Sequence, residues 1–161
     1  MLIDTHAHLT WDSFKPDLQE VVGRAKEAGI THVINIGADL ISSSAAVKLE
    51  CAGIKCYSSI GLHPHEAGKY INKYGQTIYD RGQFGLEKIY LDNLGKVAKI
   101  IAIGECGLDY HFAGVDYYPS QTSEEKQKEL QKELFKLQIS LAKKLNLPLI
   151  IHSRDSWEYI F

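Results

Sequence analysis

Short apolar segments alternate with longer amphipathic ones along the whole chain, and this alternation constrains the fold more than any other feature. The apolar segments are rich in β-branched residues and predict strands, whereas the segments between them place apolar residues at helical spacing. We expect strands over 2–4, 31–37, 54–61, 99–105 and 147–153, and helices over 15–29, 39–53, 86–98 and from 123 onwards. Strands that alternate with helices are typical of parallel sheets with right-handed crossovers, so the sequence predicts an α/β fold.

The helix expected from residue 123 carries a stripe of leucines at helical spacing, namely Leu130, Leu134, Leu137, Leu141 and Leu145. Such a stripe is typical of the buried face of a helix, although it would also suit a partner-binding zipper. A chain of 161 residues is long enough for one domain with a core and too short for two of ordinary size. We therefore expect residues 1–161 to form a single domain.

The composition restricts the classes of ligand and the compartment. A formal net charge of -2 argues against a broad basic surface for nucleic acid, so a phosphate-rich ligand would need a local site. The three cysteines lack C-x-x-C spacing, which predicts neither a disulfide framework nor a thiolate zinc site. The first residues lack the pattern of a signal peptide, and no run approaches the length of a membrane span. We expect a cytoplasmic protein without membrane contact.

Polar clusters follow the expected strands at the points where they end. They are THAHL after the first strand, GLHPH after the third, GECGLDYH around the end of the fourth, and HSRD after the fifth. A barrel would bring these ends together at its carboxyl mouth, whereas an open sheet would spread them along a line. The clustering favours a (β/α)8 TIM-barrel type of fold, of which the sequence holds about the first five βα units.

His6 and His8 share one face of the first strand because side chains alternate along a strand. Together with Glu105 and His152 they offer three imidazoles and a carboxylate, a donor set that suits zinc, manganese or similar divalent ions. A carboxylate can bridge two ions, so Glu105 is the candidate bridge and the candidate catalytic residue. The alternatives are two half-exposed histidines and a strand-end glutamate paired with a cation.

These segments, in this order, resemble the marker segments of the TatD family of metal-dependent deoxyribonucleases in the amidohydrolase superfamily. The resemblance runs from Leu2 to Asp155 and includes the stretch QKELFKLQISLAKKLNLPLIIHSRD. It implies a barrel with two divalent cations, Mg²⁺, Mn²⁺ or Zn²⁺. His6 and His8 would bind one ion and His152 the second, with Glu105 between them. The implied activity is metal-assisted hydrolysis of phosphodiesters in DNA, often as a 3′ to 5′ exonuclease.

Four further residues are expected around the metals. His63 and His65 flank Pro64, whose fixed φ makes a rigid loop that could aim an imidazole at a substrate phosphate or simply turn at the surface. Arg154 could grip a phosphate through its planar guanidinium, or neutralise a nearby carboxylate. Asp109 is expected to orient a ligand histidine rather than to bind metal itself.

The resemblance also implies a metal-ligand histidine after a sixth strand and an aspartate after an eighth, and neither can be assigned in this sequence. We expect a truncated catalytic protein, with a complementing or self-associating chain and a natural derivative as alternatives. Two other functions stay open. One is a different hydrolase of the superfamily acting on a small amide, lactone or phosphate ester, and the other is a noncatalytic module that binds metal or nucleic acid.

Overall fold

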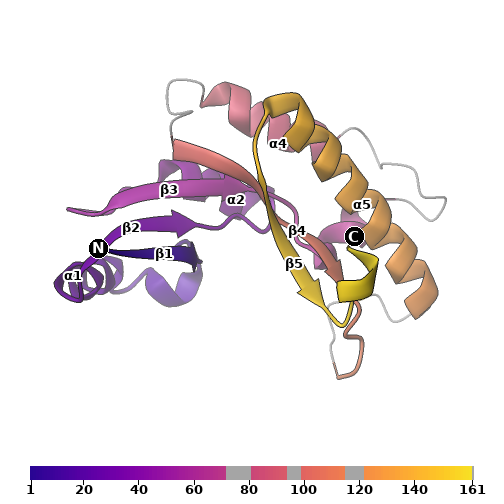
Figure 1. The fold of residues 1–161 in the computed structure, drawn as a ribbon, viewed down its shortest axis with the longest axis horizontal. Helices are drawn as coiled ribbons and strands as arrows, with labels where there is room; N and C mark the ends of the chain where they lie inside the picture. Colours follow the sequence, from indigo (N-terminus) through magenta and orange to yellow (C-terminus); the bar gives the residue numbers. More distant parts are fainter. Residues whose placement is uncertain (72–80, 94–98, 115–121, 161) are drawn as a thin grey trace.

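A computed structural model describes residues 1–71, 81–93, 99–114 and 122–160. Five parallel strands form one sheet in the order β1-β2-β3-β4-β5, and the sheet twists strongly between its two ends (Figure 1). The strands are β1 (Leu2–Ala7), β2 (Ile30–Asn35), β3 (Lys55–Ile60), β4 (Ile100–Asp109) and β5 (Leu149–Arg154). Spatial order follows chain order without reversal, which is the arrangement of successive units in a barrel rather than of a doubly wound sheet. The α/β prediction is confirmed.

Helices connect the strands and cover the sheet. They are α1 (Leu18–Glu27), α2 (Leu40–Lys48), α3 (Ala67–Tyr70), α4 (Arg81–Asp92) and α5 (Glu124–Leu145). Short 3₁₀ turns η1 (Asp12–Phe14), η2 (Pro64–Glu66) and η4 (Trp157–Tyr159) follow β1, β3 and β5. Among the described residues, no helix combines the length and apolar character needed to cross a lipid bilayer. Because the strands are parallel, their carboxyl ends lie at one edge of the sheet, where these 3₁₀ turns begin.

The structure corrects several predicted boundaries. The second helix ends at Lys48 rather than at Gly53, because Leu49 is extended and packs with Cys51 against the Val22 cluster. The first strand continues to Ala7. The fourth continues to Asp109 because its last residues pair with β5, so Glu105 lies within the strand rather than at its end. Residues 94–98 of the expected fourth helical segment lie outside the described residues.

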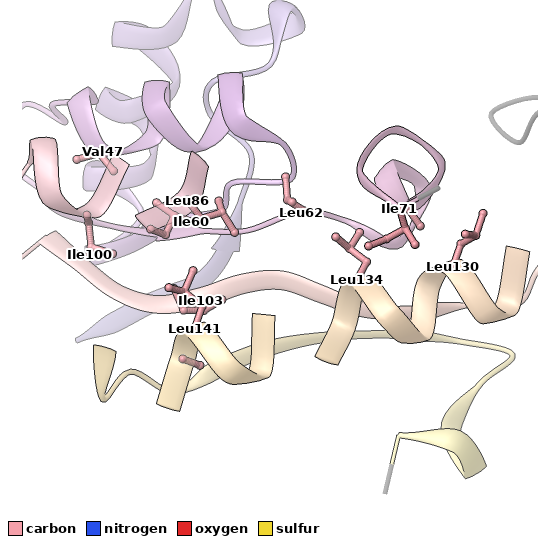
Figure 2. Close-up of a cluster of buried hydrophobic side chains, with 12 residues drawn as sticks. Val47, Ile60, Leu62, Ile71, Leu86, Ile100, Ile103, Leu130, Leu134 and Leu141 are labelled. Carbon is pink, nitrogen blue, oxygen red and sulfur yellow. The ribbon is translucent and has the colours of Figure 1, made fainter. Parts of the chain in front are cut away.

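The leucine stripe of α5 forms part of the main hydrophobic core. Leu130, Leu134 and Leu141 are buried, and Leu137 and Leu145 pack against the same cluster. Figure 2 shows Leu130 and Leu134 of α5 directed toward Ile71, the residue that follows α3. It also shows Leu141 beside Ile103 of β4. Burying a leucine side chain contributes about 2 kcal/mol, so the stripe fixes α5 on the sheet. The interpretation of the stripe as core is confirmed.

The edge strands expose some apolar side chains. Leu2 and Ile3 of β1 and Ile151 of β5 are exposed in the described part of the chain. Unpaired strand edges favour association with further strands. Association at these edges stays a prediction.

Two glycines allow β3 and β4 to approach closely beside the polar edge. A Cβ atom added to Gly61, the residue after β3, would lie 2.3 Å from the carbonyl carbon of Gly104 in β4. Such a distance cannot be tolerated between these atoms, so the backbones would have to separate. Gly104 precedes Glu105, and the separation would move that carboxylate.

We predict that Gly61→Ala lowers the free energy of unfolding by roughly 2 kcal/mol because the added methyl overpacks two backbones. Gly23→Ala is the matched control, since a Cβ at Gly23 in α1 meets nothing within 4 Å. The control should be stabilised by about 0.5–1 kcal/mol through helix propensity. Urea unfolding measures both variants, and equal midpoints for Gly61→Ala and the unsubstituted protein would contradict the prediction.

Candidate metal centre

A cleft at the carboxyl ends of the strands collects most of the residues that the sequence singles out. Its volume is about 380 Å³, and its walls include His6, His8, His63, His65, Glu105 and His152. These residues come from β1 and the segment after it, from the η2 region, from β4 and from β5. The four predicted metal ligands therefore lie together although they are far apart in the sequence.

The carboxylate of Glu105 occupies the middle of this cleft and faces two groups of imidazoles. Its Oε1 lies 2.9 Å from Nδ1 of His152. Its Oε2 lies 3.6 Å from Nε2 of His6 and 3.8 Å from Nε2 of His8. The two oxygens of one side chain thus face separate sets of nitrogen donors, an arrangement in which a carboxylate could lie between two cations.

Three overlapping groups of side chains among the described residues could each hold a metal ion. They are His6 with His8 and Glu105, His63 with Glu105 and His152, and His63 with His65 and Asp109. Within each group the potential ligand atoms lie within 4.8 Å of one another. Imidazole nitrogens and carboxylate oxygens suit zinc, manganese and related divalent ions, so the residues fit the metals that the sequence predicts.

The strand pairing is irregular at two places in the metal centre, near His6 and near Glu105. The β1–β2 register shifts between Asp4 and Ala7, around His6. The β4–β5 register shifts between Ile103 and Cys106, around Glu105. Such irregularities re-aim side chains that a regular pleat would direct elsewhere, and they are common beside active sites. The backbone N–H of Glu105 is then fixed by donating to the carbonyl of Gly37, at 2.7 Å.

The loop between β3 and α3 directs two histidines into the cleft. Pro64 is buried and begins η2, and the N–H of His63 donates to the carbonyl of Ala38 at 2.7 Å. Nε2 of His63 lies 3.2 Å from Nδ1 of His152, and Nε2 of His65 lies 2.9 Å from Oδ2 of Asp109. The loop is therefore part of the centre rather than a surface turn with solvent-facing histidines.

Asp109 contacts a second histidine as well. Its Oδ2 lies 3.2 Å from Nε2 of His152, whose other ring nitrogen faces Glu105. The carboxylate also accepts a hydrogen bond from the N–H of His111, at 3.1 Å. Asp109 is thus placed to orient His65 and His152, and it also belongs to one of the three donor groups.

The lowered pKa values of three histidines in the cleft suit metal binding. Burial lowers the pKa of His63 to about 3, and the charges of His152 and His65 act in the same direction. Burial also lowers the pKa of His8 and of His65. An imidazole with a lowered pKa is neutral at pH 7 and keeps a lone pair for a cation.

The two buried carboxyl groups are held ionised. Burial disfavours ionisation of Glu105, but the hydrogen bond from His152 and the neighbouring imidazoles outweigh it and lower its pKa. Asp109 behaves in the same way, with His65 as its main partner. For His152, burial favours the neutral ring, but the contacts with Glu105 and Asp109 prevail and raise its pKa.

Arg154 lies at the margin of this cluster, at the end of β5. Its side chain is exposed, and its positive charge contributes to the lowered pKa of His65. The carboxylate of Asp155, one of its alternative partners in the sequence, lies 2.8 Å from Nδ1 of His111. Arg154 thus stands close enough to His65 to influence it electrostatically, and the residue is exposed to solvent.

The sequence interpretation missed two buried glutamines that hold the polar loops. Gln138 of α5 accepts a hydrogen bond from the N–H of Leu62 and donates one to its carbonyl, each at 2.8 Å. Gln131 makes the same pair of bonds with the backbone of Asp109, at 2.7 and 2.8 Å. Two glutamines seven residues apart on the leucine-bearing face of α5 are the signal that could have revealed them. Through these bonds α5 fixes the start of the GLHPH loop and the end of β4.

Trp11 was also missed. It lines the cleft in the segment after β1, where its ring stacks on His8. An aromatic residue three positions after the second histidine of an H-x-H segment was the available signal.

The fold and the site together define a class: barrel-type α/β proteins that carry a histidine and carboxylate centre for divalent cations at the carboxyl ends of their strands. The sequence model of the family described as TatD related DNase matches residues 3–161, so the chain belongs to that family.

Similar proteins agree with this assignment. The chain is 35% identical to an uncharacterized metal-dependent hydrolase, YabD of Bacillus subtilis, over 98% of the chain and 52% of that protein. It is 34% identical to the 3'-5' ssDNA/RNA exonuclease TatD of Yersinia pseudotuberculosis, with the same coverage of each. The crystal structure of YjjV, a TatD homologue from Escherichia coli K12, matches with a TM-score of 0.73 and 25% identity, over 99% of the chain and 53% of that protein. The chain spans about half the length of these relatives.

We predict that Glu105→Gln weakens the binding of two divalent cations at once, by at least about tenfold each, because the amide lacks the shared negative charge. Glu66→Gln is the matched control, since Glu66 lines the same cleft but pairs with Lys69 at 2.7 Å. Calorimetric titration and elemental analysis measure affinity and content. Unchanged metal content in Glu105→Gln would refute the bridging role.

Proposed function

We propose that this chain forms part of a metal-dependent hydrolase that cleaves phosphodiester bonds of single-stranded DNA, as a 3′ to 5′ exonuclease. The observation that carries the proposal is the position of Glu105, with one oxygen directed to His152 and the other to His6 and His8. Family membership and the names of relatives such as the exonuclease of Yersinia pseudotuberculosis support the substrate class.

In this proposal His6 and His8 bind one cation, His152 binds a second, and Glu105 lies between the two. Two divalent cations, Mg²⁺, Mn²⁺ or Zn²⁺, would supply the positive charge that polarises a phosphate and makes water a better nucleophile near neutral pH. The chain's own contribution is to hold four ligands in a fixed arrangement and to favour the deprotonated forms of two of them. The lowered pKa values of His8 and Glu105 serve the second requirement.

His63, His65 and Arg154 are proposed to contact the substrate phosphate. His63 is neutral at pH 7, since its pKa is about 3, and offers one N–H for a hydrogen bond. His63 also belongs to two of the three donor groups, so its unprotonated ring nitrogen, which carries the lone pair, could instead face a cation. Arg154, exposed at the end of β5, can supply two parallel hydrogen bonds to phosphate oxygens.

A cytoplasmic location completes the proposal. Cys51, Cys56 and Cys106 are all free thiols, as expected of a protein from a reducing compartment.

The first test is hydrolysis by the complete gene product that contains this chain. We expect single-stranded DNA labelled at its 5′ end to be shortened stepwise from the 3′ end when Mg²⁺, Mn²⁺ or Zn²⁺ is added, and to remain intact with a chelator. Gel analysis of the products measures the direction of cleavage. Cleavage of small esters without cleavage of DNA would contradict the proposed substrate.

Asp109→Asn tests the orienting role of that carboxylate. Asparagine keeps the shape but loses the charge that holds the imidazoles of His65 and His152, so we expect a 10- to 100-fold loss of metal affinity or turnover. Asp92→Asn on α4 is the control, because Asp92 pairs only with the exposed Lys88 among the described residues. Calorimetry and initial rates measure the effect, and wild-type values for Asp109→Asn would exclude the role.

A further inference from the structure

Trp11 forms an aromatic wall of the metal-site cleft. Its indole stacks on the imidazole of His8, with ring centroids 4.4 Å apart and an angle of 15° between the planes. His8 in turn lies 3.8 Å from Glu105, measured from Nε2 to Oε2. Trp11 is nevertheless 51% exposed. An indole that has one covered face and lies at the edge of the cleft therefore presents much of its surface to whatever enters.

The position of Trp11 is fixed by the backbone around it. Its N–H donates to the carbonyl of His8 at 3.0 Å, and its carbonyl accepts from the N–H of Phe14 at 3.0 Å. The N–H of Leu9 donates to the side chain of the buried Asn35, at 2.7 Å. The turn after β1 is thus tied to β2 and to η1. Because its backbone turn is held in this way and its ring stacks on His8, Trp11 loses little conformational entropy when a second ring stacks on it.

The remaining walls of the cleft explain why an aromatic contact would matter. Asp39 and Glu66 line it, so the described walls add negative charge rather than a basic surface for phosphates. Asp39 accepts a hydrogen bond from the N–H of Ser42 at the start of α2, and Glu66 pairs with Lys69. A nucleotide would therefore draw its electrostatic attraction mainly from cations at the metal centre. A contact that does not depend on charge would add to that attraction.

We propose that Trp11 is a stacking platform for a nucleobase of the single-stranded substrate, next to the phosphate held at the metal centre. This inference rests on the proposed function and specifies which part of the substrate the cleft recognises. Every nucleobase has a π-face, so stacking would bind all four bases with little sequence preference. Because His8 lies behind the indole, the platform joins base recognition directly to a proposed metal ligand.

The chain provides a matched control in its second tryptophan. Trp157 is 71% exposed and belongs to η4, where it lines a separate hollow with Ser153, Asp155, Ser156 and Glu158. The two tryptophans therefore differ in the cleft that they line. Trp157→Phe also leaves Trp11 as the only tryptophan, which allows its fluorescence to be followed alone.

The experiment compares two oligomers that carry the same number of phosphates in Mg²⁺. One is a thymidine oligomer and the other replaces each nucleoside by a tetrahydrofuran unit without a base, and both carry the same phosphorothioate linkages, which resist hydrolysis. In Trp157→Phe protein, the thymidine oligomer should quench the fluorescence of Trp11 and the abasic oligomer should leave it nearly unchanged. Anisotropy of labelled oligomers gives the affinities of the variants.

We expect Trp11→Ala to bind the thymidine oligomer about tenfold more weakly, with little change for the abasic oligomer. Trp11→Phe should retain most of the affinity because phenylalanine also stacks, and Trp157→Ala should bind as the unsubstituted protein does. The Mg²⁺ affinity of Trp11→Ala should stay within about twofold, by calorimetry. These results together would establish a base platform.

If Trp11→Ala binds both oligomers equally more weakly, or loses Mg²⁺ affinity to the same extent, the inference is overturned. Such a result would show that Trp11 only holds His8 in place. Absence of thymidine binding by the unsubstituted protein would overturn it too. The hydrolysis assay separates this failure from that of the proposed function. DNA cleavage without base-dependent binding at Trp11 would refute the platform alone, whereas base-dependent binding without cleavage would refute the nuclease activity alone.

Discussion

The carboxylate of Glu105, placed between two sets of imidazoles, is the interaction on which the rest of the centre depends. A buried carboxylate is costly unless it is paired, and here its two oxygens face His152 on one side and His6 and His8 on the other. The hydrogen bond from His152 is the main contact that lowers its pKa and keeps it ionised despite burial. Without these contacts the same position would favour a neutral acid, which binds cations poorly.

The position of this carboxylate depends largely on contacts of the backbone, namely the close approach of two strands and a hydrogen bond of the Glu105 N–H. Gly61 and Gly104 let two strands approach, and Gly37 accepts the hydrogen bond of the Glu105 amide. Gln131 and Gln138 connect α5 to the ends of β4 and β3. The helix that supplies much of the core thus also positions the polar edge, so packing and chemistry are coupled through one element.

Much of the fold and of the candidate site could be predicted from the sequence. Each successful inference depended on the spacing of apolar residues along a short segment or on the polar residues at the end of a strand. Alternating patterns gave the order of elements, and the parity of His6 and His8 placed both near one point. The longer extent of β4 escaped prediction because it depends on pairing with β5, which lies more than 40 residues further along the chain. The glutamines of α5 escaped because a buried amide resembles an exposed one until its backbone partner is known. Trp11 escaped because its significance lies in the cleft that it borders.

Anomalous diffraction from crystals grown with Mn²⁺ tests the central claim most directly. The account predicts two anomalous peaks on either side of the Glu105 carboxylate, one within bonding distance of His6 and His8 and the other of His152. No peak beside Glu105, or peaks only at sites remote from these four side chains, would contradict it.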